Sequence, residues 1–252
     1  ILYTRVAETE EFKTADFRTV RVMMIAAGKM TPAIQDTYTA KNVKFLVQYG
    51  LTETGPTLTS LHPDEGDKAR AGSCGKKVQH VDLKLVDENG EEVPVGQPGE
   101  VWARGPGVIS GYLNRPREAD YRDDWFMTGD IAHVDADGYY YIVDRLKDIF
   151  KSGGENVSCS EVEGFLLEHP AIAEATVVRV PDDQWVEVGL AAVVLRSGQS
   201  LTLDALQAFL TGRLARFKQP KHLFIVPELP RNGSGKVLKA EVRKAWEESV
   251  PA

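Results

Sequence analysis

The chain has 252 residues, of which 42% are hydrophobic and 27% are charged, as in ordinary globular proteins of one large or two modest domains. Its net charge of −7 argues against a nucleic-acid partner held on a basic surface. No apolar run is long enough to span a bilayer. Its two cysteines, Cys74 and Cys159, indicate neither a disulfide framework nor a zinc site, and they fit a reducing cytoplasm.

The first part of the chain alternates between strand and helix signals. Residues 17–26 end in an apolar run typical of a buried strand, residues 33–41 favour a helix, and "VKFLVQYG" (43–50) indicates a second buried strand. This rhythm predicts the end of a larger α/β sheet domain over residues 1–69. Because the chain starts without Met and without an obvious helix or strand, we expect it to be the C-terminal piece of a longer protein.

Short strands at close spacing predict a β-rich subdomain over residues 70–146. "VDLKLVD" (81–87) alternates apolar and polar residues, and "GEVWARG" (99–105) lies between glycines. Residues 131–143 read as a hairpin whose turn is formed by "DADG".

Residues 147–252 predict a small α+β domain. A helix over 160–169 would be capped by Ser160 and ended by Pro170. The elements expected after it are strands at about 175–180 and 189–195, an amphipathic helix over 203–217, a strand at 222–226 and a final helix over 239–248.

Four motifs stand out in chain order. They are "YGLTETGP" (49–56), "FMTGD" (126–130), "DRLKDIFKSGGENVSCSEVE" (144–163) and "PRNGSGKVLK" (230–239). Together they resemble the adenylate-forming superfamily of acyl-CoA synthetases, peptide-synthetase adenylation domains and firefly luciferases, over essentially the whole chain. The resemblance is strongest to fatty-acid and medium-chain acyl-CoA synthetases. It implies the end of a large adenylating domain followed by a small mobile C-terminal domain.

The resemblance also implies a two-step reaction. A carboxylic acid, which we expect to be a fatty acid, reacts with ATP to give an acyl-AMP, and coenzyme A then takes the acyl group as a thioester. The first step needs no general base, because a carboxylic acid of pKa about 4 is already ionised at neutral pH. It needs positive charge and alignment instead, which agrees with five scattered histidines that share no ligand spacing.

In the first motif, the resemblance implies that Tyr49 stacks on adenine and that Gly50 belongs to the nucleotide site. Thr52 would contact the phosphates, and Glu53 would help to hold Mg²⁺, for which a carboxylate is a suitable ligand. A polar turn in which Thr52 or Glu53 caps a helix is the alternative for this motif.

The next nucleotide contacts follow the β-rich subdomain. By resemblance, Asp130 accepts both ribose hydroxyls, Ile142 lines the adenine pocket and Arg145 binds ribose or phosphate oxygens, which suits a planar guanidinium. Taken alone, an Asp in such a motif is more commonly a turn residue that satisfies its own backbone.

The linker between the domains carries three further roles by resemblance. Lys147 matches the hinge position about which the C-terminal domain pivots. Gly153 and Gly154, which allow close backbone approach, would border the pantetheine tunnel of coenzyme A with Lys151. The alternative is a solvent-exposed charged linker in which Gly-Gly is only a turn.

Lys236 lies on the glycine-rich "NGSGK" loop. The motif is not a P-loop, because Pro230 and Val237 stand where that pattern needs Gly and Ser or Thr. By resemblance, its ammonium bridges the carboxylate and the α-phosphate during adenylation, although a loop lysine is more commonly only solvated.

Two departures from the family pattern limit the interpretation. A "TSGTTG"-like phosphate loop is absent, so we expect the chain as given not to adenylate efficiently. Ala27 and Lys29 depart from the loop that usually faces adenine and the acyl group. A non-catalytic nucleotide-binding module and an adenylation domain that loads a carrier protein therefore stay open as alternatives, as does a homodimer. No carrier motif such as "GGxS" follows, which favours coenzyme A.

Overall fold

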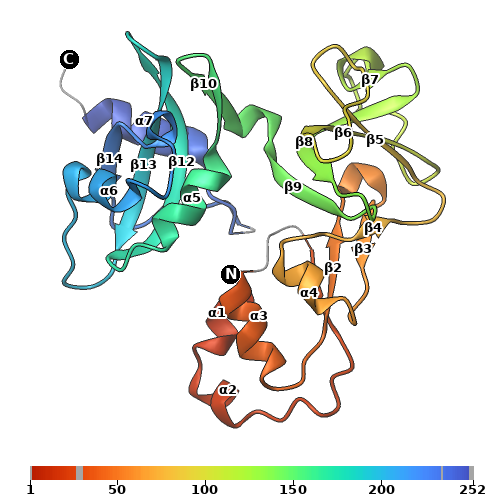
Figure 1. The fold of residues 1–252 in the computed structure, drawn as a ribbon, viewed down its shortest axis with the longest axis horizontal. Helices are drawn as coiled ribbons and strands as arrows, with labels where there is room; N and C mark the ends of the chain where they lie inside the picture. The colour runs from red at the N-terminus through yellow and green to blue at the C-terminus, as the bar shows by residue number, and fades with distance from the viewer. Residues whose placement is uncertain (1, 27–30, 234, 250–252) are drawn as a thin grey trace. The chain divides into compact units, whose positions relative to one another are not determined.

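A computed structural model describes residues 2–26, 31–233 and 235–249. The chain divides into two compact units, residues 1–142 (unit 1) and residues 143–252 (unit 2) (Figure 1). Ala27 and Lys29, which we singled out in the sequence, lie outside the described residues.

The first sheet of unit 1 has four strands in the order β1-β2-β3-β4. These strands are β1 (Met23–Ile25), β2 (Phe45–Tyr49), β3 (Thr59–Leu61) and β4 (Lys76–Lys77). β1 and β2 are parallel, and the remaining pairs are antiparallel. The two predicted strands are confirmed, although β1 is shorter than the predicted range of 17–26.

Helices pack beside this sheet in unit 1 (Figure 1). They are α1 (Leu2–Ala7), α2 (Glu10–Thr14), α3 (Pro32–Thr39) and α4 (Gly66–Arg70). Only α3 was predicted. The fully buried Tyr38 ring lies edge-on to Tyr3 and Phe12, and its hydroxyl donates to the Tyr3 carbonyl at 2.9 Å. This aromatic cluster anchors α1 and α2, which have too few residues to be stable as isolated helices.

The second sheet of unit 1 corresponds to the predicted β-rich subdomain. Its strand order is β5-β6-β8-β7, and β9 pairs with β8. The strands are β5 (Asp82–Val86), β6 (Gly99–Arg104), β7 (Tyr121–Arg122), β8 (Trp125–Val134) and β9 (Tyr140–Arg145). A short 3₁₀ helix, η2 (Arg117–Ala119), precedes β7. The predicted hairpin at 131–143 is confirmed as β8 and β9.

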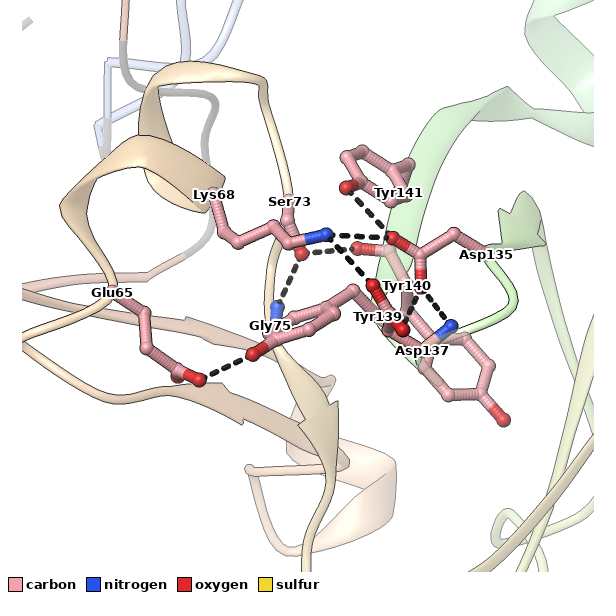
Figure 2. Close-up of polar contacts among 9 residues, drawn as sticks. All are labelled: Glu65, Lys68, Ser73, Gly75, Asp135, Asp137, Tyr139, Tyr140 and Tyr141. Carbon is pink, nitrogen blue, oxygen red and sulfur yellow. Dashed lines mark hydrogen bonds and ion pairs between the residues drawn. The ribbon is translucent and has the colours of Figure 1, made fainter.

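A polar cluster connects α4 to the β8–β9 turn (Figure 2). The Lys68 ammonium lies 3.2 Å from Asp135 and 3.5 Å from Asp137, and 4.4 Å from the centroid of the Tyr139 ring. The Tyr139 hydroxyl donates to Glu65. These contacts hold the α/β part and the β-rich part together within unit 1.

Unit 2 contains one five-stranded sheet, with the order β11-β10-β13-β12 and with β14 parallel to β13. Its strands are β10 (Ile149–Ser152), β11 (Glu155–Ser158), β12 (Ile172–Asp182), β13 (Val186–Leu195) and β14 (His222–Ile225). Its helices are α5 (Cys159–Leu167), α6 (Leu203–Leu210) and α7 (Lys239–Ser249), with the 3₁₀ helices η3 (Leu146–Asp148) and η4 (Arg216–Lys218). The α+β character predicted for this region is confirmed.

Two local predictions in unit 2 were wrong, the cap of α5 and the length of the helix over 203–217, and the alternative of a merely exposed linker does not hold. The stretch after Lys147 is no mere exposed linker, because β10 and β11 form a hairpin that buries Phe150 and Val157. The cap of α5 is Ser158, whose hydroxyl accepts from the Glu161 amide at 3.2 Å, and is not Ser160.

The helix predicted over 203–217 ends at Leu210. Gly212 adopts a φ of +79°, a left-handed conformation that no regular helix continues through. The apolar periodicity nevertheless persists beyond the helix, and Leu214 stays buried in the core of unit 2.

Candidate active site

Tyr49 and Asp130, two of the predicted site residues, are joined by a hydrogen bond. Tyr49 ends β2 and Asp130 lies in β8, and the Tyr49 hydroxyl donates to the Asp130 carboxylate at 2.9 Å. Asp130 is only 4% exposed. Burial, followed by the charge of Asp130, raises the pKa of Tyr49, so the phenol stays protonated and donates at neutral pH.

The backbone just before Asp130 lies inside β8, where the pairing with β6 shifts register between Glu100 and Trp102. Gly129 has a φ of +71°, and its amide donates to Glu100 at 3.0 Å. The Asp130 amide donates to the Thr128 hydroxyl at 3.1 Å, and that hydroxyl donates to the Val101 carbonyl at 2.7 Å. This irregular part of β8 carries Asp130, whose partner Tyr49 is 81 positions away in the sequence.

Ile142 belongs to the same region of unit 1. Both Ile142 and Tyr49 pack against the cluster that contains the fully buried Val101 and Ala132. The structure thus brings together three of the residues predicted to bind the nucleotide, an aromatic ring, an aliphatic side chain and a carboxylate.

Gly50 is required by its surroundings. A Cβ atom at this position would lie 1.8 Å from the Pro56 carbonyl oxygen. The following 3₁₀ helix, η1 (Thr52–Thr54), is capped by Thr54, whose hydroxyl accepts from the Leu51 amide at 2.9 Å. Neither Thr52 nor Glu53 fills the capping role that we considered, and Thr52 is exposed.

Glu53 has a partner that the sequence did not indicate. The Tyr112 hydroxyl donates to the Glu53 carboxylate at 2.6 Å, and the Ile109 amide donates to the Glu53 carbonyl at 2.9 Å. The hydrogen bond to Glu53, with burial second, raises the pKa of Tyr112 to about 12. No local signal reveals this pair, because 59 positions separate the two residues.

The segment that carries Arg145 and Lys147 is anchored inside unit 2. Asp144, only 9% exposed, accepts from the Arg145 amide at 2.8 Å, the Ser158 hydroxyl at 2.7 Å and the Ser160 amide at 2.9 Å. Asp144 was missing from our list of site residues. Lys147 is exposed within η3.

Gly153 and Gly154 form the tight turn between β10 and β11. Their φ values of +59° and +90° suit a two-residue hairpin that favours glycine. A Cβ atom on Gly153 would lie 2.6 Å from the Trp185 ring. Lys151 is exposed on β10 beside this turn.

Lys236 is exposed on a braced loop of unit 2. Its amide donates to the Asn232 side chain at 2.9 Å, and the Asn232 amide donates to the Lys236 carbonyl at 2.9 Å. Arg231 bridges to Val237 through the backbone, and its guanidinium donates to the Gly235 carbonyl at 2.8 Å. These contacts join the two sides of the loop around Lys236 through residues 231, 232, 235 and 237.

Comparison with known proteins identifies the family. The sequence profile of the AMP-binding enzymes matches residues 2–113, and that of the AMP-binding enzyme C-terminal domain matches residues 161–236. The chain belongs to the adenylate-forming AMP-binding enzymes. Its fold agrees, because the mixed α/β architecture with several sheets matches solved members of this family.

Similar relatives are coenzyme A ligases. A feruloyl-CoA synthase of Amycolatopsis sp is 39% identical over 248 residues, which is 97% of this chain and 50% of the relative. A 2-succinylbenzoate–CoA ligase of Geobacillus sp. (strain WCH70) is 37% identical over 90% of this chain and 46% of its own length. The chain thus spans about half the length of these curated relatives.

Solved structures of similar fold include a CoA synthetase and the ATP-bound protein MatB. ATP-bound MatB from Rhodopseudomonas palustris superposes with a TM-score of 0.86 at 32% identity, over 98% of this chain and 50% of that one. The o-succinylbenzoate CoA synthetase of Bacillus subtilis, in complex with its acyl-adenylate intermediate, superposes with a TM-score of 0.82 at 32% identity, over 90% and 46%. In residues 2–26, 31–233 and 235–249, no helix is long and apolar enough to cross a membrane.

Proposed function

We propose that the protein containing this chain activates a carboxylic acid with ATP and transfers the acyl group to coenzyme A. The observation that carries the proposal is the hydrogen bond from Tyr49 to the buried Asp130, with Ile142 packed in the same region, in a chain whose similar relatives are CoA ligases. An aromatic ring, an apolar wall and a carboxylate are the groups that a nucleoside needs. The exposed ammonium of Lys236 supports the same assignment.

The first half-reaction is a displacement at phosphorus. A carboxylate oxygen attacks the α-phosphorus of ATP, the bond from that phosphorus to the pyrophosphate oxygen breaks, and acyl-AMP and pyrophosphate form. Negative charge gathers around the phosphorus, so a positioned cation lowers the barrier. In this proposal, Lys236 supplies that cation, Thr52 contacts the phosphates, and Arg145 binds ribose or phosphate oxygens.

The adenosine half would be held by unit 1. Tyr49 stacks on adenine beside Gly50, Ile142 lines the pocket, and Asp130 accepts the ribose hydroxyls. The burial of Asp130 supports its role, because a hydrogen bond to a desolvated carboxylate is stronger than one in water.

Glu53 fits a role in holding Mg²⁺. Mg²⁺ is commonly bound by one or two carboxylates together with substrate phosphates, and the Glu53 carboxylate is oriented by the Tyr112 hydroxyl at 2.6 Å. When bound, the ion would neutralise charge on the phosphates. Removal of Mg²⁺ by a chelator is therefore expected to abolish adenylation.

The second half-reaction forms the thioester. The sulfur of coenzyme A attacks the acyl carbon, and the bond to AMP breaks. We propose that unit 2 pivots at Lys147 between the two steps and brings Lys151, Gly153 and Gly154 toward the pantetheine. Lys147→Pro, which restricts φ at that position, should slow thioester formation most. An unchanged thioester rate would remove Lys147 as the pivot.

The acid is proposed to carry an aromatic ring. The resemblance seen in the sequence favoured a fatty acid, whereas the printed names of similar relatives include feruloyl-, 4-coumarate-, indoleacetate- and 2-succinylbenzoate-CoA enzymes. Cinnamate-type, indole and benzoate acids are therefore the first members of a substrate panel, and medium- and long-chain fatty acids are the second.

The test uses the protein expressed from its complete reading frame. ATP–pyrophosphate exchange with each acid, followed by AMP release on addition of coenzyme A, should detect both half-reactions. AMP binding without exchange for any acid would favour a non-catalytic nucleotide-binding module. Exchange without coenzyme A-dependent AMP release would favour a carrier-protein acceptor.

The 252-residue chain by itself is proposed to adenylate poorly, because its sequence contains no "TSGTTG"-like phosphate loop. Exchange by the isolated chain at a rate near that of the complete protein would contradict this. A cytoplasmic location, where ATP and coenzyme A are at hand, and a homodimer stay predictions. Size-exclusion chromatography with light scattering tests the dimer, and cell fractionation tests the location.

A further inference from the structure

Lys239 lies three residues after Lys236, at the first position of α7. Its side chain is only 28% exposed, and its ammonium lies 3.1 Å from Glu163 of α5 and 3.8 Å from Asp148 of η3. Lys239 is the last residue of the "PRNGSGKVLK" motif.

Glu163 is itself rigidly placed. The carboxylate oxygen that faces Lys239 also accepts from the Thr176 hydroxyl at 3.0 Å and from the Val177 amide at 2.8 Å. Both donors belong to β12, which is paired along its length with β13 in the sheet of unit 2. The Lys239 ammonium thus contacts α5 directly through Glu163, the sheet indirectly through the same carboxylate, and η3 through Asp148.

Lys239 is protonated at neutral pH. Burial opposes the charged form, but the carboxylates of Glu163 and Asp148 favour it, and the pKa of Lys239 is raised. Burial also raises the pKa of the neighbouring Cys159 thiol to about 12, so the thiol is neutral near pH 7. An ammonium between two carboxylates therefore persists at neutral pH.

The loop that carries Lys236 is closed between two braced ends. At its first end, the Arg231 guanidinium pairs with Glu174 of β12. At its second end, the Leu238 amide donates to the Pro230 carbonyl at 2.8 Å, and Lys239 follows directly. The ion pair between Lys239 and Glu163 therefore lies next to the second end of the loop.

We propose that Lys239 is a positioning residue that holds the Lys236 loop against Glu163 and ties it to Asp148, the residue after the predicted pivot Lys147. A displacement of about 1 Å at a reacting group can cost about 100-fold in rate. The catalytic consequence rests on the proposed function, whereas the structural link can be tested without any catalysis.

The first test is hydrogen–deuterium exchange on the complete protein. Lys239→Met, which keeps an apolar stem and removes the charge, should speed exchange of the amides of residues 231–238 by about 10-fold or more, equivalent to about 1.4 kcal/mol of lost protection. Lys239→Arg should restore the slow exchange. Lys244→Met is the matched control, because Lys244 lies on the same helix with a 75% exposed side chain.

Glu163→Gln covers the case in which Lys239→Met does not fold. A glutamine can still accept from Thr176 and Val177 but lacks the charge that faces Lys239. It should speed exchange of the same loop by a smaller factor. Unchanged loop exchange in Glu163→Gln, or in a folded Lys239→Met, would overturn the proposal.

The second test measures the two half-reactions. Lys239→Met should reduce adenylation by about 10- to 100-fold, with a nearly unchanged KM for ATP, and should leave thioester formation from supplied acyl-adenylate within about 3-fold. Equal losses in both half-reactions would indicate a general structural role and overturn the assignment. If the wild-type protein shows no adenylation, the proposed function fails, and loop exchange alone decides the role of Lys239.

Discussion

The residues of unit 1 that we propose to bind the nucleotide and the Lys236 loop of unit 2 differ in burial and in hydrogen bonding. Asp130 is 4% exposed and paired with Tyr49 inside unit 1, whereas Lys236 is exposed on a hairpin loop of unit 2. A buried carboxylate is oriented before a ligand arrives. The contacts described around Lys236 order the backbone of its loop, through Asn232 and Arg231. The two regions therefore differ in which part of the chain these contacts fix, a side chain at Asp130 and the backbone at Lys236.

The largest loss of activity is expected from substitution of the exposed Lys236. Lys236→Ala removes the only cation proposed to bridge the carboxylate and the α-phosphate, so adenylation should fall by about 100- to 1,000-fold. Thioester formation from supplied acyl-adenylate should change little. ATP–pyrophosphate exchange and a thioester assay measure the two steps, with Lys244→Ala as the control. Equal losses in both steps would remove the assigned role.

In unit 1, next to Tyr49, Gly50→Ala should destabilise the protein. The new methyl would meet the Pro56 carbonyl oxygen at 1.8 Å, and relief of that overlap must move backbone, at a cost of about 3 kcal/mol. Urea unfolding of the complete protein measures the change. Gly164→Ala is the control, since nothing lies within 4 Å of a Cβ atom at that position in α5. Equal stability of the two variants would contradict the tight approach at Gly50.

Asp130→Asn tests the preformed pair itself. An amide oxygen can still accept from Tyr49, so the fold should persist, but the charged acceptor for ribose is lost. The dissociation constant for AMP should rise by about 10- to 100-fold, as measured by titration calorimetry. Asp124→Asn, whose carboxylate side chain is 82% exposed, should bind AMP normally. An unaltered affinity in Asp130→Asn would exclude Asp130 from the ribose site.

The smallest effect is expected at the β12–β13 turn of unit 2. Val186 is 76% exposed with a φ of +69°, a left-handed conformation that costs a β-branched residue about 1 to 2 kcal/mol. Val186→Gly should therefore raise the free energy of unfolding by about 1 kcal/mol. Val95→Gly, at another exposed valine outside the left-handed region, should not. A loss of stability in Val186→Gly would refute the strain.

Local patterns predicted the regular elements well where the apolar period was clear. β2, β5 and β6 were expected from buried or alternating runs, and α3 and α7 from helical spacing. The same reasoning missed α1 and α2, whose order comes from the aromatic cluster around Tyr38 and not from their own periodicity. It also read the β10–β11 hairpin as a linker, because charged residues and glycines hid two short strands.

In the candidate site, too, the sequence indicated some residues, whereas some of their contacts became known only from the fold. The order of four motifs was enough to place the chain in its family and to name Tyr49, Asp130 and Ile142, which the fold then brings together. The tie between Glu53 and Tyr112 had no sequence signal. Neither did the anchoring of the Arg145 segment by Asp144.

The sequence by itself determined the family, the strand and helix periods and the identity of the chemical groups, because these depend on residue type and short spacing. Only the tertiary structure decided which groups are buried, paired or braced. Glu163, for example, meets Lys239 because α5 and α7 both contact β12. Such contacts depend on packing between distant segments, and short-range spacing carries no information about them.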